Sequence, residues 1–499
     1  MSAGRDFDVV VIGAGAGGCV MAGRLARAGV GSILLLEAGP DLRADLPSDL
    51  LDAWRLPRPP DWGYASEPTD GGELQKLRRG RLVGGTSWFT RFAVRGSRAD
   101  FDRWAALGNP GWAFDDVLPY FRRFEADEDF GDRPWHGNLG YLPINRYLDV
   151  ELTEAHAAAV AAAEAIGFSP VDDHNQPGAL GVGRMPMNSV IGVRVSATAY
   201  LDVPELAGSL DVRADSPVDR VVIEGGRATG VRLVDGSVIE AATIVVAGGT
   251  YGSPLVLMRS GIGPAGDLRA LGIDVQVDLP GVGANLSDHP SVVVDTGYHG
   301  PARDIPKLHS IATFHSNASP PTEPHDLLLW IADPEAPDVP DQLAIESVLL
   351  RPEARGRVSL RSADPNETPR IELPKATDRD IRRLREGIER AIAIASHSAM
   401  RGLCPGPATT MPEDDDALRT YIAENGYSIP HVVGTCAMGP RPEDGAVVDA
   451  SGRVHGIDGL FVADASIIPE PPSGFSHLPT LMLAERLSEV VAGAANRTA

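Results

Sequence analysis

Four short runs of mostly apolar residues mark the predicted buried strands of this chain. The first two, residues 9–12 and Ile33–Leu36, flank a stretch of helical character that ends near Gly29. Two later runs, residues 243–246 and 459–463, have the same unbroken pattern. Unbroken runs of this length are typical of strands buried on both faces of a sheet. The pattern therefore predicts a βαβ unit near the start of the chain and further buried strands later.

Other segments alternate between apolar and polar positions or carry helical patterns. Short strands are predicted over residues 212–213, 218–223 and 230–234, where Gly-Gly and Asp-Gly pairs indicate β-hairpins. Helices are predicted over residues 155–166, Asp378–Ala395 and 480–492. Between His289 and Pro430 the chain carries many prolines and alternating strands such as residues 358–360. That change of character indicates a second lobe.

A glycine-rich turn follows the first strand and carries the main chemical signal. The sequence Gly13-Ala14-Gly15-Ala16-Gly17-Gly18 contains the G-x-G-x-x-G pattern, and Glu37 ends the second strand. Gly13 lets the chain turn, Gly15 lets the backbone approach a pyrophosphate, and Gly18 lets the helix pack closely on the sheet. The free N–H groups and positive dipole end of the helix attract phosphates. Together these features predict a site for an adenine dinucleotide.

The acidic residue and a late strand narrow the identity of that dinucleotide. The Glu37 carboxylate can accept hydrogen bonds from ribose hydroxyls and would repel a 2′-phosphate, which argues against NADP. The fingerprint alone does not choose between FAD and NAD. Residues 459–464 form a further strand that ends in Asp464. Two-lobed flavoproteins often return at such a point to place an Asp near the pyrophosphate and ribityl chain of FAD, so this strand favours FAD.

Composition places the chain among globular proteins and argues against some partners. With 499 residues, 43% hydrophobic and 23% charged, the chain is long enough for two lobes. Its formal charge of -23 argues against nucleic acid. Cys19, Cys404 and Cys436 provide neither a disulfide framework nor a metal-binding spacing, so no metal is expected. No signal peptide or membrane-spanning run is apparent, so we expect a cytoplasmic protein with no transmembrane segment.

Several long motifs, in order along the chain, resemble those of the glucose–methanol–choline (GMC) oxidoreductases. They occupy residues 81–87 with 94–96, 249–263, 281–290, 431–435 and 473–480. The resemblance covers essentially the whole chain. It implies an α/β fold, with a doubly wound FAD-binding domain on a parallel sheet and an α+β substrate domain on an antiparallel sheet. The implied FAD-binding domain spans residues 1–150, 190–288 and 430–499, and the implied substrate domain spans residues 151–189 and 289–429.

The resemblance also assigns roles to particular residues. Among the twelve histidines, His431 and His477 are the implied catalytic pair above the flavin, whereas His136, His289 and His455 are interpreted as structural. We expect His431 to take the hydroxyl proton and His477 to bind the substrate oxygen, although the sequence does not fix which imidazole takes the proton. The expected cofactor-binding residues are Gly13, Gly15, Ala16, Gly18, Glu37, Ala38, Arg81, Gly84, Gly85, Ser87, Thr90, Val218, Ala247, Gly248, Asp464, Ala465, His477, Pro479 and Thr480.

Two positions depart from the family pattern. Thr90 stands where some members attach FAD through a histidine, and a threonine cannot form that bond, so non-covalent FAD is expected. Phe475 stands where many members carry Asn. The neighbouring aromatics Trp88 and Phe89 have two interpretations, crowding of the flavin edge or simple core packing.

The resemblance implies an FAD-dependent oxidoreductase that oxidises the CH-OH group of a small-molecule alcohol to a carbonyl. In this reaction a base removes the hydroxyl proton and the flavin N5 takes a hydride. Two alternatives share the fold: a non-oxidative lyase or light-driven decarboxylase, and a flavin-binding protein without catalysis. The sequence does not name the alcohol, the oligomeric state, or the electron acceptor among dioxygen, a quinone and a carrier cofactor.

Overall fold

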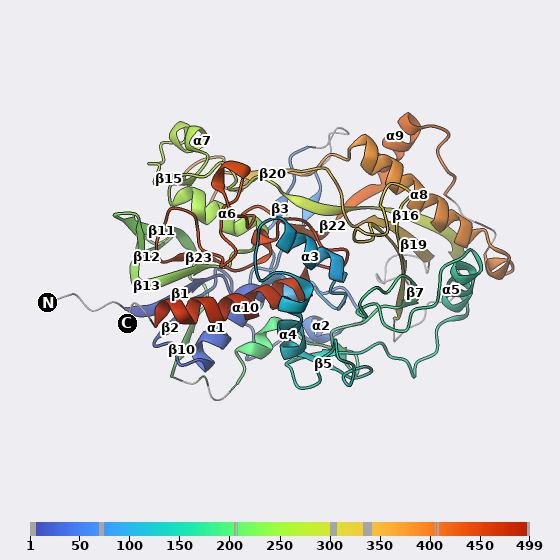
Figure 1. Cartoon of the computed structure of the whole chain (residues 1–499), viewed down its shortest axis with the longest axis horizontal. Coiled ribbons are helices and arrows are strands. Elements are labelled where there is room, and N and C mark those ends of the chain that lie inside the picture. The colour runs from blue at the N-terminus through green and yellow to red at the C-terminus, as the bar shows by residue number, and fades with distance from the viewer. Residues whose placement is uncertain are drawn as a thin grey trace.

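Two β-sheets lie side by side in the computed structural model and divide the chain into two lobes (Figure 1). The structure describes residues 6–68, 74–203, 206, 208–299, 307–332, 342–404, 406 and 409–496. Within these residues, no helix is long and apolar enough to span a bilayer.

The first sheet has five parallel strands and an antiparallel extension. Its order is β10-β2-β1-β13-β12-β11, and a further strand, β23, pairs with β13. The first half of the long strand β13 pairs with β12, and its second half pairs in parallel with both β1 and β23. The strands are β1 (Phe7–Ile12), β2 (Ile33–Leu36), β10 (Leu210–Arg213), β11 (Val218–Glu224), β12 (Arg227–Leu233), β13 (Val238–Val246) and β23 (Leu460–Val462).

The apolar runs of the sequence form the centre of this sheet. The β2 residues and the last four residues of β1 are buried, as expected for a central strand covered on both faces. The Gly225-Gly226 turn joins β11 and β12 as an antiparallel hairpin, as predicted. The hairpin prediction is wrong for residues 212–213, because β10 pairs in parallel with β2 instead.

Two helices cover this sheet next to the glycine turn. Helix α1 (Ala16–Arg27) and helix α10 (His477–Ala495) lie side by side, joined by the ion pair of Arg24 with Glu485 at 2.7 Å (Figure 1). Helix α10 begins three residues before the predicted start. Pro479 falls within its first turn, where the missing N–H costs no helical hydrogen bond.

The second sheet has six antiparallel strands. Its order is β22-β16-β19-β18-β17-β7. Helices α5 (Glu154–Ala165) and α8 (Asp378–Ala395) pack with these strands in a core formed by alanine, isoleucine, leucine and valine side chains (Figure 1). The strands are β7 (Gly181–Arg184), β16 (Ser287–His299), β17 (His309–Phe314), β18 (Leu327–Ala332), β19 (Gln342–Leu349) and β22 (Gly426–Val433).

A separate apolar cluster from the same strands packs with the C-terminal segment before α10. Ile311, Leu328 and Val348 alternate with residues of the α5–α8 core, and together with Ile429 they form one cluster with Phe475. Because strand side chains alternate between faces, this cluster lies on the opposite face of the sheet from α5 and α8. That face therefore meets the segment that leads into α10, whose first residue is the predicted catalytic residue His477.

Shorter elements complete the described fold. The remaining helices are α2 (Ser48–Leu51), α3 (Arg98–Ala106), α4 (Phe114–Phe124), α6 (Gly249–Arg259), α7 (Ala265–Ala270) and α9 (Asp415–Asn425). The two-stranded ribbons pair β3 (Tyr64–Ala65) with β4 (Lys76–Leu77), β5 (Glu125–Asp127) with β6 (Leu142–Ile144), β8 (Ser189–Val190) with β9 (Val193–Arg194), β14 (Ile262–Gly263) with β15 (Val277–Asp278), and β20 (Arg357–Ser359) with β21 (Arg370–Glu372).

Candidate active site

A cavity of about 470 Å³ gathers most of the predicted site residues from distant parts of the chain. The β1–α1 turn, the end of β2, the start of α6, the end of β22 and the start of α10 all contribute to its wall. The predicted residues that line it are Gly13, Gly15, Ala16, Glu37, Ala38, Arg81, Gly85, Ser87, Thr90, Val218, Ala247, Gly248, His431, Asp464, Ala465, His477 and Thr480.

Three predicted cofactor-binding residues lie behind the wall of the cavity. A Cβ atom on Gly18 would lie 1.8 Å from the carbonyl oxygen of Gly13, so this glycine brings helix α1 close to strand β1. Gly84 has a φ of 97° and donates its N–H to the carbonyl of Ala14 at 2.7 Å. Pro479 is buried in the first turn of α10. These residues shape the backbone of the site.

The N-terminus of α1 opens into the cavity. Gly15 is the N-cap residue of this 12-residue helix, and no side chain among the described residues caps it. A Cβ atom on Gly15 would meet no described atom within 4 Å, so space lies above the helix end. Free N–H groups and the positive end of the helix dipole therefore face a space that can hold an anionic group.

Glu37 holds the turn around this space. One carboxylate oxygen accepts the N–H of Ala14 and the other accepts the N–H of Gly39, each at 2.9 Å. Burial raises the pKa of the Glu37 carboxyl to about 7. Each carboxylate oxygen has a second lone pair, so Glu37 retains acceptor capacity for a hydroxyl group.

Asp464 organises a further part of the cavity wall. Its Oδ2 accepts the N–H of Gly249 at the start of α6, and its Oδ1 accepts the N–H of Ser466 in the 3₁₀ helix η6 (Ala465–Ile467). Burial raises the pKa of this carboxyl. The Asp464 side chain thus fixes two helix starts beside the cavity.

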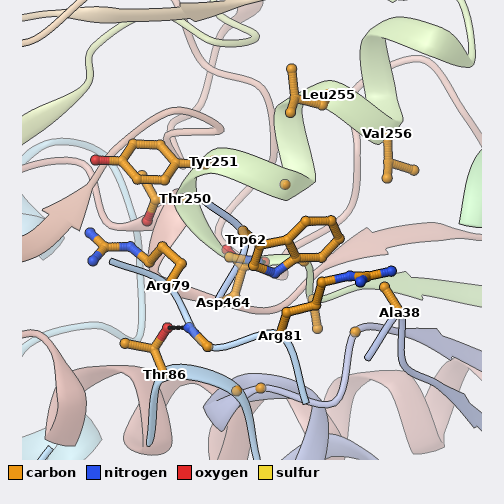
Figure 2. Close-up of a pocket in the computed structure, with 18 of the residues that line it drawn as sticks. Ala38, Trp62, Arg79, Arg81, Thr86, Thr250, Tyr251, Leu255, Val256 and Asp464 are labelled. Atoms are coloured by element: carbon orange, nitrogen blue, oxygen red, sulfur yellow. Dashed lines mark hydrogen bonds between the residues drawn. The ribbon is translucent and has the colours of Figure 1, made fainter. Parts of the chain in front are cut away.

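Cationic and aromatic side chains complete this part of the wall, and of these only Arg81 is a predicted cofactor-binding residue. Figure 2 shows Trp62 between Arg79 with Tyr251 on one side and Arg81 with Ala38 on the other. The guanidinium carbon of Arg79 lies 4.9 Å from the centroid of the Tyr251 ring, and that of Arg81 lies 5.3 Å from the Trp62 ring. Arg259 also lines the cavity. Guanidinium groups suit the phosphates of a dinucleotide. Arg81 and Arg259 lie within the motifs at residues 81–87 and 249–263, whereas Arg79 lies outside them.

The two predicted catalytic histidines meet at the cavity from different elements. His431 lies on β22 and His477 is the first residue of α10. Burial lowers the pKa of His431 well below its ordinary value, and His289, Arg79 and His477 add to the effect. Burial lowers the pKa of His477 to about 4. Both rings are therefore neutral imidazoles near neutral pH, and each has a ring nitrogen able to accept a proton.

A third histidine contacts His431. The Nδ1 atoms of His289 and His431 lie 3.3 Å apart, with ring centroids 5.4 Å apart. Oδ1 of Asp288 accepts the backbone N–H groups of both residues, at 2.9 and 3.0 Å. The sequence alone indicates a structural role for His289 and does not connect it with the site.

An aromatic cluster packs against the His431 ring through Phe475. Phe475 lies 4.5 Å from His431 between centroids, and it also contacts Phe92 and Trp330. Trp88 instead donates its Nε1–H to the carbonyl of Val83 and packs with Leu50 and Leu82. Core packing is therefore the correct interpretation of Trp88.

Thr90 is the residue whose chemistry bears on how a cofactor is attached. It lines the cavity, and its hydroxyl donates to the carbonyl of Ser87 at 2.9 Å. The Thr90 hydroxyl therefore stabilises a local turn of the backbone.

Comparisons with known proteins cover almost the whole chain. Two profiles described as GMC oxidoreductase match residues 7–291 and 352–484. A 5-(hydroxymethyl)furfural oxidase from Methylovorus sp. is 34% identical, over 97% of this chain and 98% of that protein. An oxygen-dependent choline dehydrogenase from Stenotrophomonas maltophilia is 32% identical, over 99% and 96% of the two chains. The crystal structure of a pyridoxine 4-oxidase from Mesorbium loti superimposes with a TM-score of 0.87 at 29% identity, covering 97% and 98% of the two chains.

Proposed function

The chain belongs to the GMC oxidoreductase family, and from this membership and the geometry of the site we propose that His431 is the base in its oxidation of an alcohol. We further propose a primary alcohol on an aromatic or heteroaromatic ring as the substrate. FAD, when bound, supplies the atom that accepts the hydride from the substrate carbon. The protein must hold the alcohol there and accept its hydroxyl proton.

One observation carries the assignment of the base: two neutral imidazoles face one cavity from β22 and α10. Nδ1 of His431 is engaged by His289, which leaves Nε2 for the substrate. Nε2 of His477 is buried and has no hydrogen-bond partner within the described residues. A substrate hydroxyl between the two rings would satisfy that nitrogen while its proton passes to His431.

The residues around α1 are suited to hold FAD. The N–H groups behind Gly15 would receive the pyrophosphate, Glu37 would accept a ribose hydroxyl, and the guanidinium groups of Arg79, Arg81 and Arg259 would offset the phosphate charge. The FAD is proposed to be non-covalent, because Thr90 has no ring nitrogen with which to form a histidyl bond. Acid precipitation of the yellow protein should therefore release all of its flavin into the supernatant.

The aromatic preference is supported by the wall beside His431. Phe475 lies 4.5 Å from His431 between ring centroids, and it also contacts Trp330 and Phe92. An aromatic side chain against the proposed base favours a flat ring attached to the reacting carbon. The names of the 5-(hydroxymethyl)furfural oxidase and the pyridoxine 4-oxidase agree with this substrate class. The same names support dioxygen as the electron acceptor. The cytoplasmic location remains a prediction from the sequence.

Anaerobic rapid mixing tests the proposal. The FAD-loaded protein should lose its flavin absorbance with benzyl alcohol, react more slowly with the saturated control cyclohexylmethanol, and regain its absorbance when air is admitted. His431→Ala should bind FAD normally and be reduced about 10²- to 10⁴-fold more slowly. His477→Asn should be milder, because an amide can still donate to the substrate oxygen. A severe defect in His477→Asn with a mild one in His431→Ala would reverse the two roles.

The same experiment separates the alternatives. A lyase would convert substrate without a net change of flavin absorbance, a light-driven decarboxylase would need illumination, and a non-catalytic protein would leave both substrate and flavin unchanged. If wild-type protein reduces its flavin but neither histidine variant is slowed, the assignment of the base fails.

A further inference from the structure

We propose that His289 is a positioning residue that fixes the tautomer of His431, so that Nε2 of His431 carries the lone pair that faces the substrate. This inference rests on the proposed role of His431 as the base. The contact between the two rings carries it, because the Nδ1 atoms face each other at 3.3 Å and one proton must lie between them.

Two arrangements of that proton are conceivable, and they have opposite consequences. If His289 donates from Nδ1, then Nδ1 of His431 is the acceptor and Nε2 of His431 carries a hydrogen, so this ring cannot take a proton from the substrate. If His431 donates from Nδ1, its Nε2 is a free acceptor that lines the cavity. The surroundings of His289 decide between the two.

The His289 ring is buried, and two backbone groups act on it. Its Nε2 is buried and has no partner at hydrogen-bonding geometry within the described part of the chain. The backbone groups of Pro472 and Leu350 act on the ring, and both favour a proton on it. Proline has no N–H, so its group is the carbonyl. Because Nδ1 of His289 faces His431, Nε2 is the nitrogen left to carry the proton that these backbone groups favour.

The proton on Nε2 makes Nδ1 of His289 an acceptor. Burial lowers the pKa of His289 to about 4, so the ring carries one proton rather than two near neutral pH. Nδ1 of His289 then accepts the Nδ1–H of His431. The opposed nitrogens are held in place by the pairing of β16 with β22 and by Asp288, which accepts the backbone N–H of each histidine.

A pair of variants of nearly equal size isolates the acceptor. In His289→Asn the side-chain oxygen can replace Nδ1 as the acceptor, whereas His289→Leu keeps a similar volume and removes it. Both should retain FAD and the wild-type melting temperature within a few degrees. We expect flavin reduction by benzyl alcohol to slow about tenfold in the leucine variant, the factor that one net hydrogen bond represents. The asparagine variant should recover most of this loss.

Two readouts distinguish tautomer control from a packing defect. In the leucine variant the solvent deuterium isotope effect on flavin reduction should increase, because proton transfer becomes slower than in the wild type. NMR of ¹⁵N-histidine-labelled protein without substrate should show His431 as the Nδ1–H tautomer in the wild type and in His289→Asn, and a mixture in His289→Leu. The His431 signals are identified by their absence in His431→Ala.

The outcomes separate this inference from the proposed function. If His431→Ala is slow but His289→Leu matches the wild type in rate and tautomer, the positioning role is overturned and the base assignment stands. If His431→Ala is not slow, the proposed function itself fails. An Nε2–H signal for His431 in the wild type would overturn the inference directly. Equal loss in the leucine and asparagine variants, with unchanged tautomer, would show a structural role only.

Discussion

The ring of Phe475 lies against the imidazole of His431, with centroids 4.5 Å apart and ring planes at 32°. Phe475 belongs to the segment before α10, whereas His431 lies on β22 of the antiparallel sheet. The contact thus joins the two lobes at the proposed base. Because the phenyl ring is buried and apolar, it excludes water from one face of His431, and burial is the main cause of the low pKa of that ring.

Replacing Phe475 by Ala should therefore change both stability and the pH dependence of the reaction. Loss of a buried phenyl ring is expected to lower the free energy of unfolding by about 3–5 kcal/mol. Water would reach His431 and raise its pKa towards about 6.5, so flavin reduction should decline as the pH falls below about 7. Denaturant unfolding and anaerobic reduction across a pH series measure the two effects.

Leu328→Ala is the matched control for that variant. Leu328 is buried in the same apolar cluster as Phe475, and its removal should destabilise the protein without altering the pH profile. If the profile shifts equally in both variants, general loosening rather than exposure of His431 is the cause.

Gly15 and Gly18 should respond differently to the same substitution. A Cβ on Gly15 would enter the open space above α1, and its φ of −76° suits alanine. A Cβ on Gly18 would lie 1.8 Å from the carbonyl oxygen of Gly13. Gly15→Ala should thus leave the apoprotein as stable as the wild type and weaken FAD binding at least tenfold. Gly18→Ala should destabilise the apoprotein itself.

Two measurements check this pair. Thermal unfolding of the FAD-free proteins compares their stability, and FAD titration followed by flavin fluorescence quenching gives the affinity. Tight FAD binding by Gly15→Ala would mean that the pyrophosphate does not approach the N-terminus of α1.

The wild-type reaction should be nearly independent of pH above about pH 6. The folded-state pKa of His477 is lowered to about 4, and that of His431 lies well below its ordinary value. A lowered histidine pKa means that the neutral, proton-accepting form already dominates at pH 6, and that the rate falls only at more acidic pH. Anaerobic flavin reduction from pH 5 to 9 tests this, and a rise centred between pH 6 and 7 would contradict it.

The lowered histidine pKa values change the free energy of unfolding with pH in the same direction. Histidines with lowered folded-state pKa values contribute stability above about pH 6.5, and this contribution is lost as the pH falls towards their folded values. The apoprotein should therefore lose stability between about pH 6.5 and 4, and His477→Asn should lose less over this interval.

Much of the fold was predictable because it rests on local signals. The helix Asp378–Ala395 was predicted to the residue, since Thr377 and Asp380 form a capping box at its start. Family membership confirms three properties that the motifs implied: the two-sheet fold, the FAD cofactor and the alcohol oxidoreductase class. The domain limits and the individual site roles stay predictions.

The rest depended on contacts that one sequence does not reveal. The sequence pattern predicts a hairpin at residues 212–213, but β10 pairs with β2, which lies almost 180 residues earlier in the chain. His289 meets His431 only because β16 pairs with β22. Nothing local to either histidine marks that contact.

A buried ionic cluster lies away from the cavity, and we expect it to affect stability but not catalysis. The Arg146 guanidinium donates to Asp127 at 3.0 Å and to Asp173 at 2.8 Å, and Asp173 also contacts Nε2 of His136 at 2.9 Å. Arg146→Met would leave these carboxylates buried with less positive charge, so the free energy of unfolding should fall by about 3–5 kcal/mol. Flavin reduction by the folded variant should be unchanged.

The exposed pair of Arg98 with Asp115 is the control for Arg146. Its side chains are 43% and 73% exposed, so Arg98→Met should cost no more than about 1 kcal/mol. Urea unfolding of both variants at one pH gives the comparison. Burial separates the two cases: the Arg146 side chain is fully buried, and water cannot replace its charge. Equal small losses would mean that Asp127 and Asp173 take up protons or water when the guanidinium is removed.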